Sequence, residues 1–504
     1  MPLPLTYPGV YIEEVPSGVR TITGVATSIG LFIGWAARGP IDEAVRIFSF
    51  ADYERTYGGL DQRTLLGYAV RQFFDNGGSD AYVIRLVAAE DEANSITGAV
   101  AATVTVGSIA FTAASPGEWA HQYAVRVTMR TDTGFTERFK VEVVDAATKA
   151  IVFEVFENLS IEATDGRFVD TFIKDRSALI RATAGTTTPT DETKAFTGGD
   201  DGDVLDPNST DTDLQAAFHK AVLALFDQGQ IADRLDLFNI VCVPGESDKD
   251  TIQKLQTDCK ARRAFLVVDC TEDVKVEDAV DEMAAMNGGD PSYSAYYFPW
   301  VLAADALKQN AIRAFPPCGF VAGVYARTDA ARGVWKAPAG IETTLTGALG
   351  FKVPMSDAEN GTLNPHAVNC LRTLPVYGNL VWGARTMDGD NDRGSEWKYV
   401  PVRRMALFLE ESLFRGTQWV VFEPNDEPLW AQIRLNINAF MQTLFRQGAF
   451  QGATPREAYF VKCDRETTTQ ADINLGIVNI HVGFAPLKPA EFVVIRIQQI
   501  AGEL

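Results

Sequence analysis

The stretch EWKYVPVRRMALFLEESLFRGTQWVVFEPNDEPLWAQIRLNINAFMQTLFRQGAF, residues 396–450, has the strongest patterning in the chain. Pro428 follows a run of capping and acidic residues, and the first turn of a helix tolerates proline at such a position. Gly448 supplies a left-handed stop. Between them apolar residues recur at helical spacing, namely Leu429, Trp430, Ile433, Ile437, Phe440, Met441, Leu444 and Phe445. We therefore predict an amphipathic helix that buries this stripe against a partner.

The first half of the same stretch predicts a second helix that ends near Gly416, with Met405, Phe408, Leu409 and Leu413 at helical spacing. Residues 417–422 (TQWVVF) lie between the two helices and are β-branched or aromatic, as is typical of a buried strand. The pattern therefore predicts helix, strand, helix.

The opposite face of the later helix is polar and contains no acidic residue. It presents Gln432, Arg434, Asn438, Gln442 and Arg446. In a chain with a formal net charge of −21, this strip is either ordinary solvated surface or a dock for an acidic partner.

Composition bounds the class of protein. A chain of 504 residues with 46% hydrophobic content suggests about three domains with real cores. No apolar run is long enough to span a bilayer, and MPLPLTYPG at the start resembles no signal peptide, so we expect neither export by that route nor stable membrane insertion. The net charge of −21 argues against direct nucleic-acid binding. Six cysteines without a C-x-x-C pair indicate reduced core thiols: Cys242, Cys259, Cys270, Cys318, Cys370 and Cys463.

The charge is unevenly distributed. Residues 91–210 hold 19 acidic and 10 basic residues, whereas residues 396–504 hold 12 and 11. We expect the first region to face solvent and the second to make contacts.

Strand and helix patterns alternate at the start and in the middle of the chain, which predicts a mixed α/β sheet domain formed by residues 21–89 and 201–315. The predicted strands are 28–35, 45–48, 81–87, 237–243, 265–268 and 295–300, and the predicted helices are 49–55, 64–74 and 214–225. Between these two parts, residues 90–200 contain short alternating runs such as 123–129, 139–144 and 151–156, and predict a β-rich outer insertion.

Residues 316–490 are predicted to form a C-terminal α+β domain. It begins with a helix carrying Val321 and Val324, continues as a loop-rich stretch, and reaches a strand at 376–386 before the opening stretch. The fold class is therefore α/β and α+β, with several domains.

Both termini are predicted to be strand-forming arms, residues 1–20 and 491–504. Neither predicted strand, Tyr7–Val15 or Phe492–Ile500, has a partner within turn distance, and prolines flank the first. Such a strand suits an edge or a donated strand better than a central one. The residues we assign to these arms are Tyr7, Val10, Tyr11, Ile12, Val15, Phe492, Val493, Val494, Ile495 and Ile497.

The common sequence motifs of catalysis and nucleotide binding are absent, and we expect no catalytic, cofactor or metal site. His121, His219, His366 and His481 lie in four different segments. The acidic loop 199–213 could mimic a calcium loop but lacks the EF-hand spacing, so we interpret it as a solvated hinge. Asp269-Cys270 ends a strand where α/β enzymes keep catalytic groups, yet a lone cysteine without a nearby base is more often buried filler.

Motifs along nearly the whole chain resemble the contractile tail sheath proteins, the family shared by contractile bacteriophage tails and phage-tail-like injection particles. The insertion resembles the family least, as expected of its variable outer domain. The motifs are YPGVYIEEVPSG at 7–18, GWAARGP at 34–40, FADYERTYGG at 50–59, FFDNGGSDAYVIRL at 73–86, SPGEWA at 115–120, GGDDG at 198–202, AGVYARTDAARGVWKAPAG at 322–340, VWGARTM at 381–387, YVPVRRMALFLEESL at 399–413, QWVVFEPNDEPLW at 418–430 and LKPAEFV at 487–493.

This resemblance implies a non-enzymatic structural subunit that stacks as rings around an inner tube and contracts to drive the tube through a membrane. It implies as partners further copies of the chain, the inner tube protein, and baseplate and tail terminator proteins, in a particle assembled in the bacterial cytoplasm. It also implies that terminal arms join a sheet in the C-terminal domain of neighbours, and that this domain lies at the inner radius. Because the polar strip of the later helix contains no acidic residue, we predict that it faces the inner tube with Arg434, Asn438, Gln442 and Arg446. Two alternatives remain open: a non-contractile baseplate or shell component, and an α/β hydrolase- or transferase-like enzyme.

Overall fold

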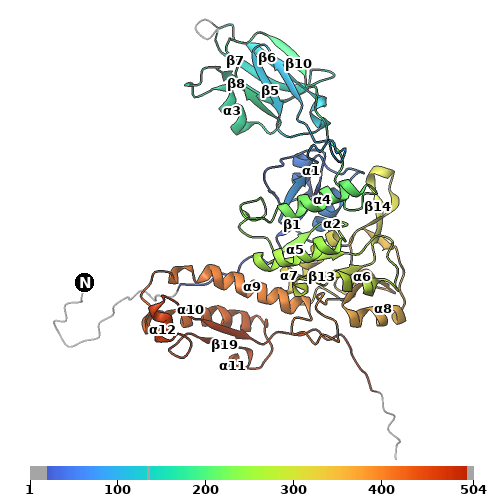
Figure 1. Cartoon of the computed structure of the whole chain (residues 1–504), viewed down its shortest axis with the longest axis vertical. Helices are drawn as coiled ribbons and strands as arrows, with labels where there is room; N and C mark the ends of the chain where they lie inside the picture. The colour runs from blue at the N-terminus through green and yellow to red at the C-terminus, as the bar shows by residue number, and fades with distance from the viewer. Residues whose placement is uncertain (1–19, 133–136, 497–504) are drawn as a thin grey trace, which may run out of the picture. The chain divides into compact units, whose positions relative to one another are not determined.

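The computed structural model describes residues 20–132 and 137–496, which divide into two compact units. The larger, which we call the α/β unit, comprises residues 27–331 and 337–403. The smaller, the C-terminal unit, comprises the described residues among 1–26, 332–336 and 404–504 (Figure 1). In the described parts of the chain, no helix is both long and apolar enough to cross a bilayer.

An eight-stranded sheet forms the centre of the α/β unit, in the order β18-β17-β13-β12-β11-β1-β3-β2. Its strands are β1 (Gly30–Trp35), β2 (Val45–Ile47), β3 (Ala81–Leu86), β11 (Ile240–Cys242), β12 (Phe265–Asp269), β13 (Ser294–Phe298), β17 (Val368–Leu374) and β18 (Gly378–Val381). Neighbours are parallel except at the edges, where β2 and β18 are antiparallel. Every residue of β1, β12 and β13 is buried, as expected of parallel strands covered by helices.

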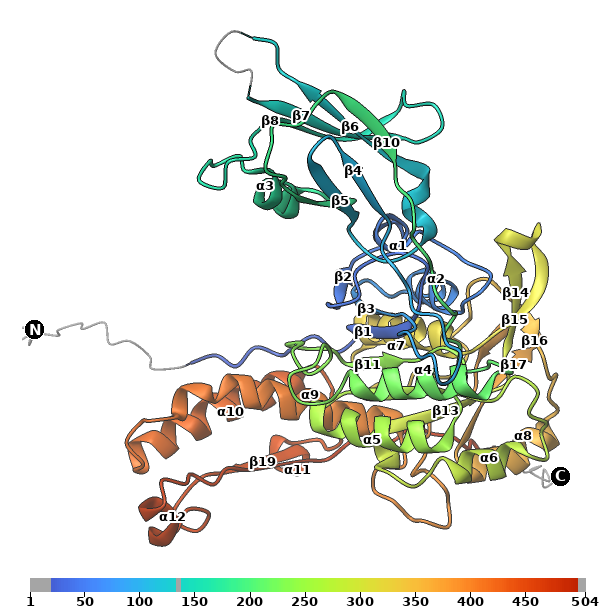
Figure 2. The same cartoon turned by 45° about the horizontal axis from the view of Figure 1, so that its top comes forward.

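The helices of this unit connect and cover the strands (Figure 2). They are α1 (Phe50–Tyr57), α2 (Leu66–Asp75), α4 (Thr212–Ala224), α5 (Lys249–Arg262), α6 (Ala279–Ala285), α7 (Cys318–Arg332) and α8 (Asp357–Leu363). A smaller antiparallel sheet, in the order β15-β14-β16, consists of β14 (Val301–Asp305), β15 (Ala311–Phe315) and β16 (Ala348–Phe351). The strands and helices predicted between residues 28 and 87 and between 214 and 300 are confirmed, with ends that shift by a few residues.

The stretch after residue 337 differs from the prediction. β17 lies in a region that the sequence predicted to be loop-rich. The strand predicted at 376–386 shortens to β18, which starts only after Val376 because that residue takes a left-handed turn conformation with a φ of 75°. Residues 316–331 and 337–403 belong to the α/β unit, where β17 pairs with β13, whereas the sequence assigned both segments to the C-terminal domain that starts at 316.

Residues 100–200 form two antiparallel sheets around a core of their own. Their elements are β4 (Thr103–Val106), β5 (Ile109–Ala113), β6 (Tyr123–Met129), β7 (Phe139–Asp145), β8 (Val152–Leu159), α3 (Val169–Arg176), β9 (Ile180–Thr183) and β10 (Glu192–Ala195). The sheet orders are β10-β6-β7-β8 and β4-β5-β9. The chain enters and leaves side by side, because Val100 and Asp200 exchange backbone hydrogen bonds of 2.9 and 3.0 Å. The β-rich character predicted for this region is confirmed, while its outward position stays a prediction.

The C-terminal unit is built on two long helices, α9 (Val400–Gly416), which begins in the α/β unit, and α10 (Glu427–Arg446). Short elements follow: α11 (Pro455–Ala458), β19 (Tyr459–Lys462), α12 (Gln470–Asn474) and β20 (His481–Phe484). Both helices predicted from the opening stretch are confirmed. Asp426 caps α10 by accepting from the Leu429 amide, and Gly448 follows it with a φ of 77°.

The strand predicted at residues 417–422 is wrong. Gln418–Val420 is one turn of 3₁₀ helix, in which the Val420 amide donates to the Thr417 carbonyl at 2.9 Å. Trp419 and Val420 pack against the helical core, whereas Val421 and Phe422 are 64% and 102% exposed. No neighbouring strand reaches this connection among the described residues, so a local turn satisfies its backbone groups instead of a ladder.

Candidate assembly surfaces

The C-terminal unit contains a sheet of only two strands, β19 and β20. They pair antiparallel, with Tyr459 opposite Phe484 and Lys462 opposite His481. One side packs on α10, where the Tyr459 hydroxyl donates to Gln442 Oε1 at 3.0 Å. Among the described residues no further strand pairs with either outer edge. Two strands alone are marginally stable, and an open edge is a template for another strand, so this sheet can accept strands on both sides.

The predicted arm residues divide into two groups. Tyr7, Val10, Tyr11, Ile12, Val15 and Ile497 lie outside the described residues. Phe492, Val493, Val494 and Ile495 are described and belong to no strand of this chain, and their exposed fractions are 77–80%. Four consecutive large apolar side chains in solvent mark a surface that is usually covered by a partner.

The four residues predicted to face an inner tube do not form one free strip. Arg434 donates to the Cys463 carbonyl and pairs with Glu427 of its own helix, at 2.6 Å from Oε1. Asn438 donates to the Arg434 carbonyl at 2.7 Å, and Gln442 accepts from Tyr459. Arg446 alone of the four is classed as exposed. Their orientation toward a tube stays a prediction.

Sequence reasoning missed a polar residue inside the apolar stripe of α10. Asn436 is 2% exposed, and its Oδ1 accepts from the backbone amide of Arg20 at 3.1 Å. Ser412 of α9 is fully buried and accepts from the Val25 amide at 3.2 Å. These two side chains hold the start of the described chain against both helices. The sequence did contain a signal for this contact, because Asn436 is a polar residue at a position of α10 that its helical spacing places in the apolar stripe.

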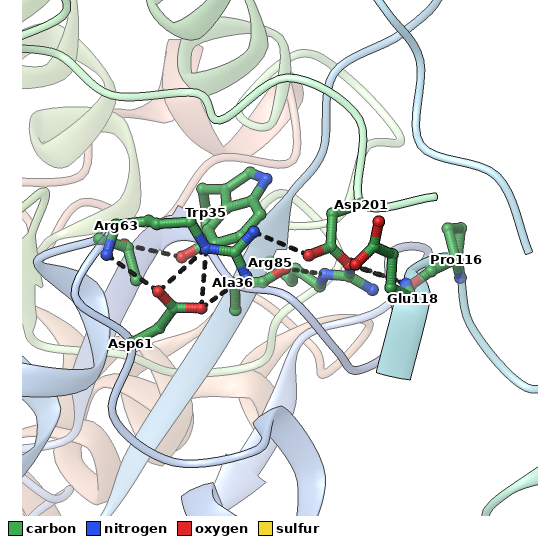
Figure 3. Close-up of polar contacts among 9 residues, drawn as sticks. Trp35, Ala36, Asp61, Arg63, Arg85, Pro116, Glu118 and Asp201 are labelled. Carbon is green, nitrogen blue, oxygen red and sulfur yellow. Dashed lines mark hydrogen bonds and ion pairs between the residues drawn. The ribbon is translucent and has the colours of Figure 1, made fainter. Parts of the chain in front are cut away.

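Arginines and one aspartate join residues 100–200 to the α/β sheet (Figure 3). Arg85 is 2% exposed and donates to three carbonyls, those of Ala36, Gly39 and Pro116, at 2.5, 2.7 and 3.0 Å. Burial lowers the pKa of Arg85 to about 10, so the guanidinium stays charged near neutral pH. Since only Pro116 belongs to the insertion, two of these three bonds do not depend on it.

Asp201 makes the second link at this junction. Its Oδ2 pairs with Arg63 at 2.9 Å, and its Oδ1 accepts from the Glu118 amide at 2.9 Å. Its neighbours in the acidic loop have separate partners, since Asp203 accepts from the Thr97 amide and Asp206 accepts from the Asn208 amide. The carboxylates of this loop therefore accept from backbone amides and, at Asp201, from the Arg63 side chain, and no cluster with metal-binding composition occurs in the described residues.

The pair Asp269-Cys270 lies in the core. The Asp269 carboxylate accepts from the amides of Gly245 and Cys318 at 2.9 and 2.7 Å, which ties the loop after β11 to the start of α7. Burial raises the pKa of Asp269 to about 7, although both amide hydrogen bonds favour the charged form. Burial also raises the pKa of the Cys270 thiol. A buried acid and a protonated thiol fit a structural role.

The histidines lie apart and have separate neighbours. Nε2 of His219 is 3.3 Å from Glu246, and Nδ1 of His366 is 3.0 Å from Asp390. Nε2 of His121 accepts from the Gly199 amide, and His481 is exposed on β20. The six cysteines are all buried, which confirms the prediction that they lie in cores, and their reduced state stays a prediction.

Two family models match the chain. The phage tail sheath protein central domain matches residues 236–387, and the phage tail sheath C-terminal domain matches residues 392–500, together just over half of the 504 residues. A curated relative from Pseudomonas aeruginosa (strain UCBPP-PA14), named "Putative prophage major tail sheath protein", is 27% identical over 187 residues. That match covers 36% of this chain and 45% of the relative, so it spans less than half of the relative's length.

Solved structures with the same fold cover nearly the whole chain. The sheath of the PVC extracellular contractile injection system in its contracted state matches with a TM-score of 0.60 and 24% identity, over 99% of both chains. The contracted helical sheath of the anti-feeding prophage matches with a TM-score of 0.59 and 23% identity, over 98% of this chain and 99% of that chain. A sheath tail protein from Listeria innocua matches with a TM-score of 0.61 and 15% identity, over 93% and 96%. At these identities the likeness shows the fold.

Proposed function

The chain belongs to the phage tail sheath family, and we propose that it is the structural subunit of a contractile sheath. Copies polymerise helically around an inner tube, and contraction of the sheath drives the tube through a target envelope. The observation that carries this proposal is the match of both sheath domain models to consecutive parts of one chain, residues 236–387 and 392–500. The fold shared with contracted sheaths over nearly the full chain supports it.

The two-stranded sheet is the proposed link between copies. The arms at residues 1–20 and 491–504 add as strands to the β19 and β20 edges of neighbouring subunits. An added strand satisfies the edge's backbone groups, and its side chains cover the exposed apolar groups at 492–495. Because donor and acceptor are different surfaces, the contact is head-to-tail, and such a contact can build closed rings or an open helix from identical copies.

Strand addition also suits contraction. The backbone hydrogen bonds join only the arm of one subunit to the sheet of its neighbour. The body of the subunit that donates the arm takes no part in them, so it can rotate while these bonds persist. Connectivity between subunits then survives the change of state.

The inner tube protein is the second proposed partner, and it meets the exposed part of α10. Arg446 is exposed at the end of that helix, whereas Arg434 already pairs with Glu427. We therefore assign the tube contact mainly to Arg446, with Asn438 and Gln442 as uncharged neighbours. A weak complementary charge sets register without binding so tightly that the sheath cannot slide. Baseplate and terminator proteins bind the two ends, and assembly takes place in the bacterial cytoplasm.

Electron microscopy tests the proposal. The chain is produced with and without its inner tube protein, and the particles are imaged before and after a contraction trigger such as mild acid or urea. The proposal predicts tubes in two states, one long and narrow and one short and wide. Tubes of a single length and width identify a non-contractile component instead, and a chain that stays monomeric with its tube protein contradicts a sheath role.

A further inference from the structure

Residues 20–25, which we call the strap, lie across α9 and α10 in the C-terminal unit (Figure 2). The strap belongs to no helix or strand, so its backbone amides need other partners. Two of them find side chains: the Arg20 amide donates to Asn436, and the Val25 amide donates to Ser412. The Arg20 guanidinium also stacks on Trp419, with its carbon 4.6 Å from the ring centroid. The strap is therefore held at both of its ends.

Between these hydrogen bonds, Ile22 is 6% exposed and belongs to the same core as α10. Two glycines make the close approach possible. A Cβ added at Gly416 would lie 2.6 Å from Ile22 Cγ2, and one added at Gly24 would lie 2.8 Å from Phe408 Cζ. The strap packs closely against α9 because Gly24 in the strap and Gly416 in α9 have no side chain at the points of contact.

Asn436 is costly for the stability of the subunit alone. Its side-chain nitrogen is buried and has no hydrogen-bond partner among the described residues. An unsatisfied buried amide group destabilises the folded subunit, and an apolar residue would complete the stripe of α10. Within residues 20–132 and 137–496, the hydrogen bond that Asn436 makes to another segment is the one that holds the strap.

We propose that the strap is the anchor of the N-terminal arm, and that Asn436, Ser412 and Gly416 are its positioning residues. The proposal rests on the proposed function, in which the arm reaches a neighbouring subunit. The described chain begins at Arg20, which the strap holds on the C-terminal unit, so the position of the strap fixes how far residues 1–19 can reach. Releasing residues 20–25 would add about 20 Å of slack, at roughly 3.3–3.6 Å per extended residue. An arm with that slack still pairs, but it no longer fixes the spacing between subunits.

The substitution Asn436→Leu tests the anchor. It removes the acceptor for Arg20 together with the unsatisfied nitrogen, so the melting temperature of the monomer should not fall. Amide exchange of the peptide covering residues 20–26 should become about tenfold faster or more, because the strap opens locally. Tubes of this variant should still form, but their helical repeat should be irregular, with layer lines weakened in electron micrographs.

A size swap gives an independent test. Gly416→Ala places a methyl group where Ile22 lies and should release the strap, although alanine favours a helix more than glycine does. Adding Ile22→Ala in the same chain makes room and should restore part of the helical order, which a purely local effect on α9 would not. Gly361→Ala in α8 is the matched control, since nothing lies within 4 Å of its added Cβ.

The outcomes separate the anchor from the sheath role. Unchanged exchange of residues 20–26 in Asn436→Leu overturns the assignment of Asn436. Faster exchange with tubes as regular as those of the wild type overturns the anchor while leaving the proposed function intact. A wild-type chain that forms no tubes with its tube protein contradicts the proposed function, and the anchor falls with it.

Discussion

Residues 100–200 and the C-terminal unit both contain antiparallel sheets, but the first region buries its apolar side chains in its own core, whereas the second leaves a small sheet and several apolar side chains uncovered. The insertion packs a sheet of four strands and a sheet of three around a core drawn from its own residues, between Ala102 and Phe196. The C-terminal unit has two paired strands, and Phe492–Ile495 remain exposed. A region with a complete core depends little on its surroundings, whereas an incomplete sheet depends on what is added to it. We therefore expect assembly to depend on the second region and to tolerate changes in the first.

The largest expected effect follows from removing residues 1–17. The deletion should abolish tube formation, because one of the two donated strands is lost. The monomer should stay folded with an unchanged melting temperature, since the described helical core and the eight-stranded sheet are built from residues after position 20. Sedimentation measures assembly, and circular dichroism measures folding.

The substitution Phe153→Glu is a control for this deletion, because it alters an exposed aromatic residue of the insertion that is 47% accessible. It should assemble normally. Normal tubes from the chain that lacks residues 1–17 would show that the N-terminal arm is dispensable.

Two core substitutions, one in each region, test directly whether assembly depends on the C-terminal unit more than on the insertion. Met441→Ala in α10 should cost about 2–5 kcal/mol and Phe111→Ala in the insertion about 3–5 kcal/mol, because each opens a cavity at a fully buried position. Despite the similar cost, only Met441→Ala should reduce assembly below the melting point, because α10 supports the accepting sheet. Calorimetry and sedimentation on the same samples check this. Equal losses of assembly from both variants would mean that the insertion contributes to the wall.

Deleting residues 90–200 and joining the ends should have a smaller effect. The two flanks of the deletion lie near each other, because the Ala99 amide donates to the Ala88 carbonyl at 3.1 Å and a Cβ added at Gly202 would lie 2.6 Å from the Ala99 nitrogen. Arg85 keeps two of its three carbonyl acceptors, so the local cost should be about 1–3 kcal/mol. Tubes should still form and be narrower. A soluble, folded deletion variant that forms no tubes would contradict the peripheral placement of the insertion.

The smallest effect concerns charge on α10. Replacing both Arg434 and Arg446 by glutamate should weaken loading onto the inner tube several-fold without preventing self-assembly, since exposed charges contribute at most about 1 kcal/mol each. Arg446→Glu alone should account for most of the change and leave melting unaltered, because Arg434 is engaged within its own chain. Co-sedimentation with tubes measures loading. Unaltered loading in the double variant would return these residues to ordinary surface.

Periodic patterns in the sequence predicted most of the regular elements. The stripe of α10 identified the helix, its start at Pro428 and its stop at Gly448, because helical burial imposes a regular repeat. Composition was weaker evidence. The letters TQWVVF suit a strand or a 3₁₀ turn equally, and only the absence of a neighbouring strand among the described residues decides between them.

The features that the sequence did not predict, namely β17 and the partners of two polar residues of α10, depend on contacts between distant parts of the chain. β17 escaped prediction because its polar residues interrupt the apolar pattern, yet Asn369 is buried and donates to Tyr296 and Arg385. The partners of Arg434 and Asn436 lie far along the chain, at Cys463 and Arg20, so no local pattern could reveal them. The motifs identified the family, but they did not identify the strap.

Oxidative cross-linking of assembled tubes tests the donation of strands most directly. The native cysteines are all buried, so introduced thiols react selectively. We would combine Val494→Cys in the C-terminal arm with His481→Cys on β20, and oxidise tubes in both the extended and the contracted state. Strand addition between copies predicts ladders of covalent multimers in both states, and none from either single variant. Cross-links confined to single chains in both states would contradict it.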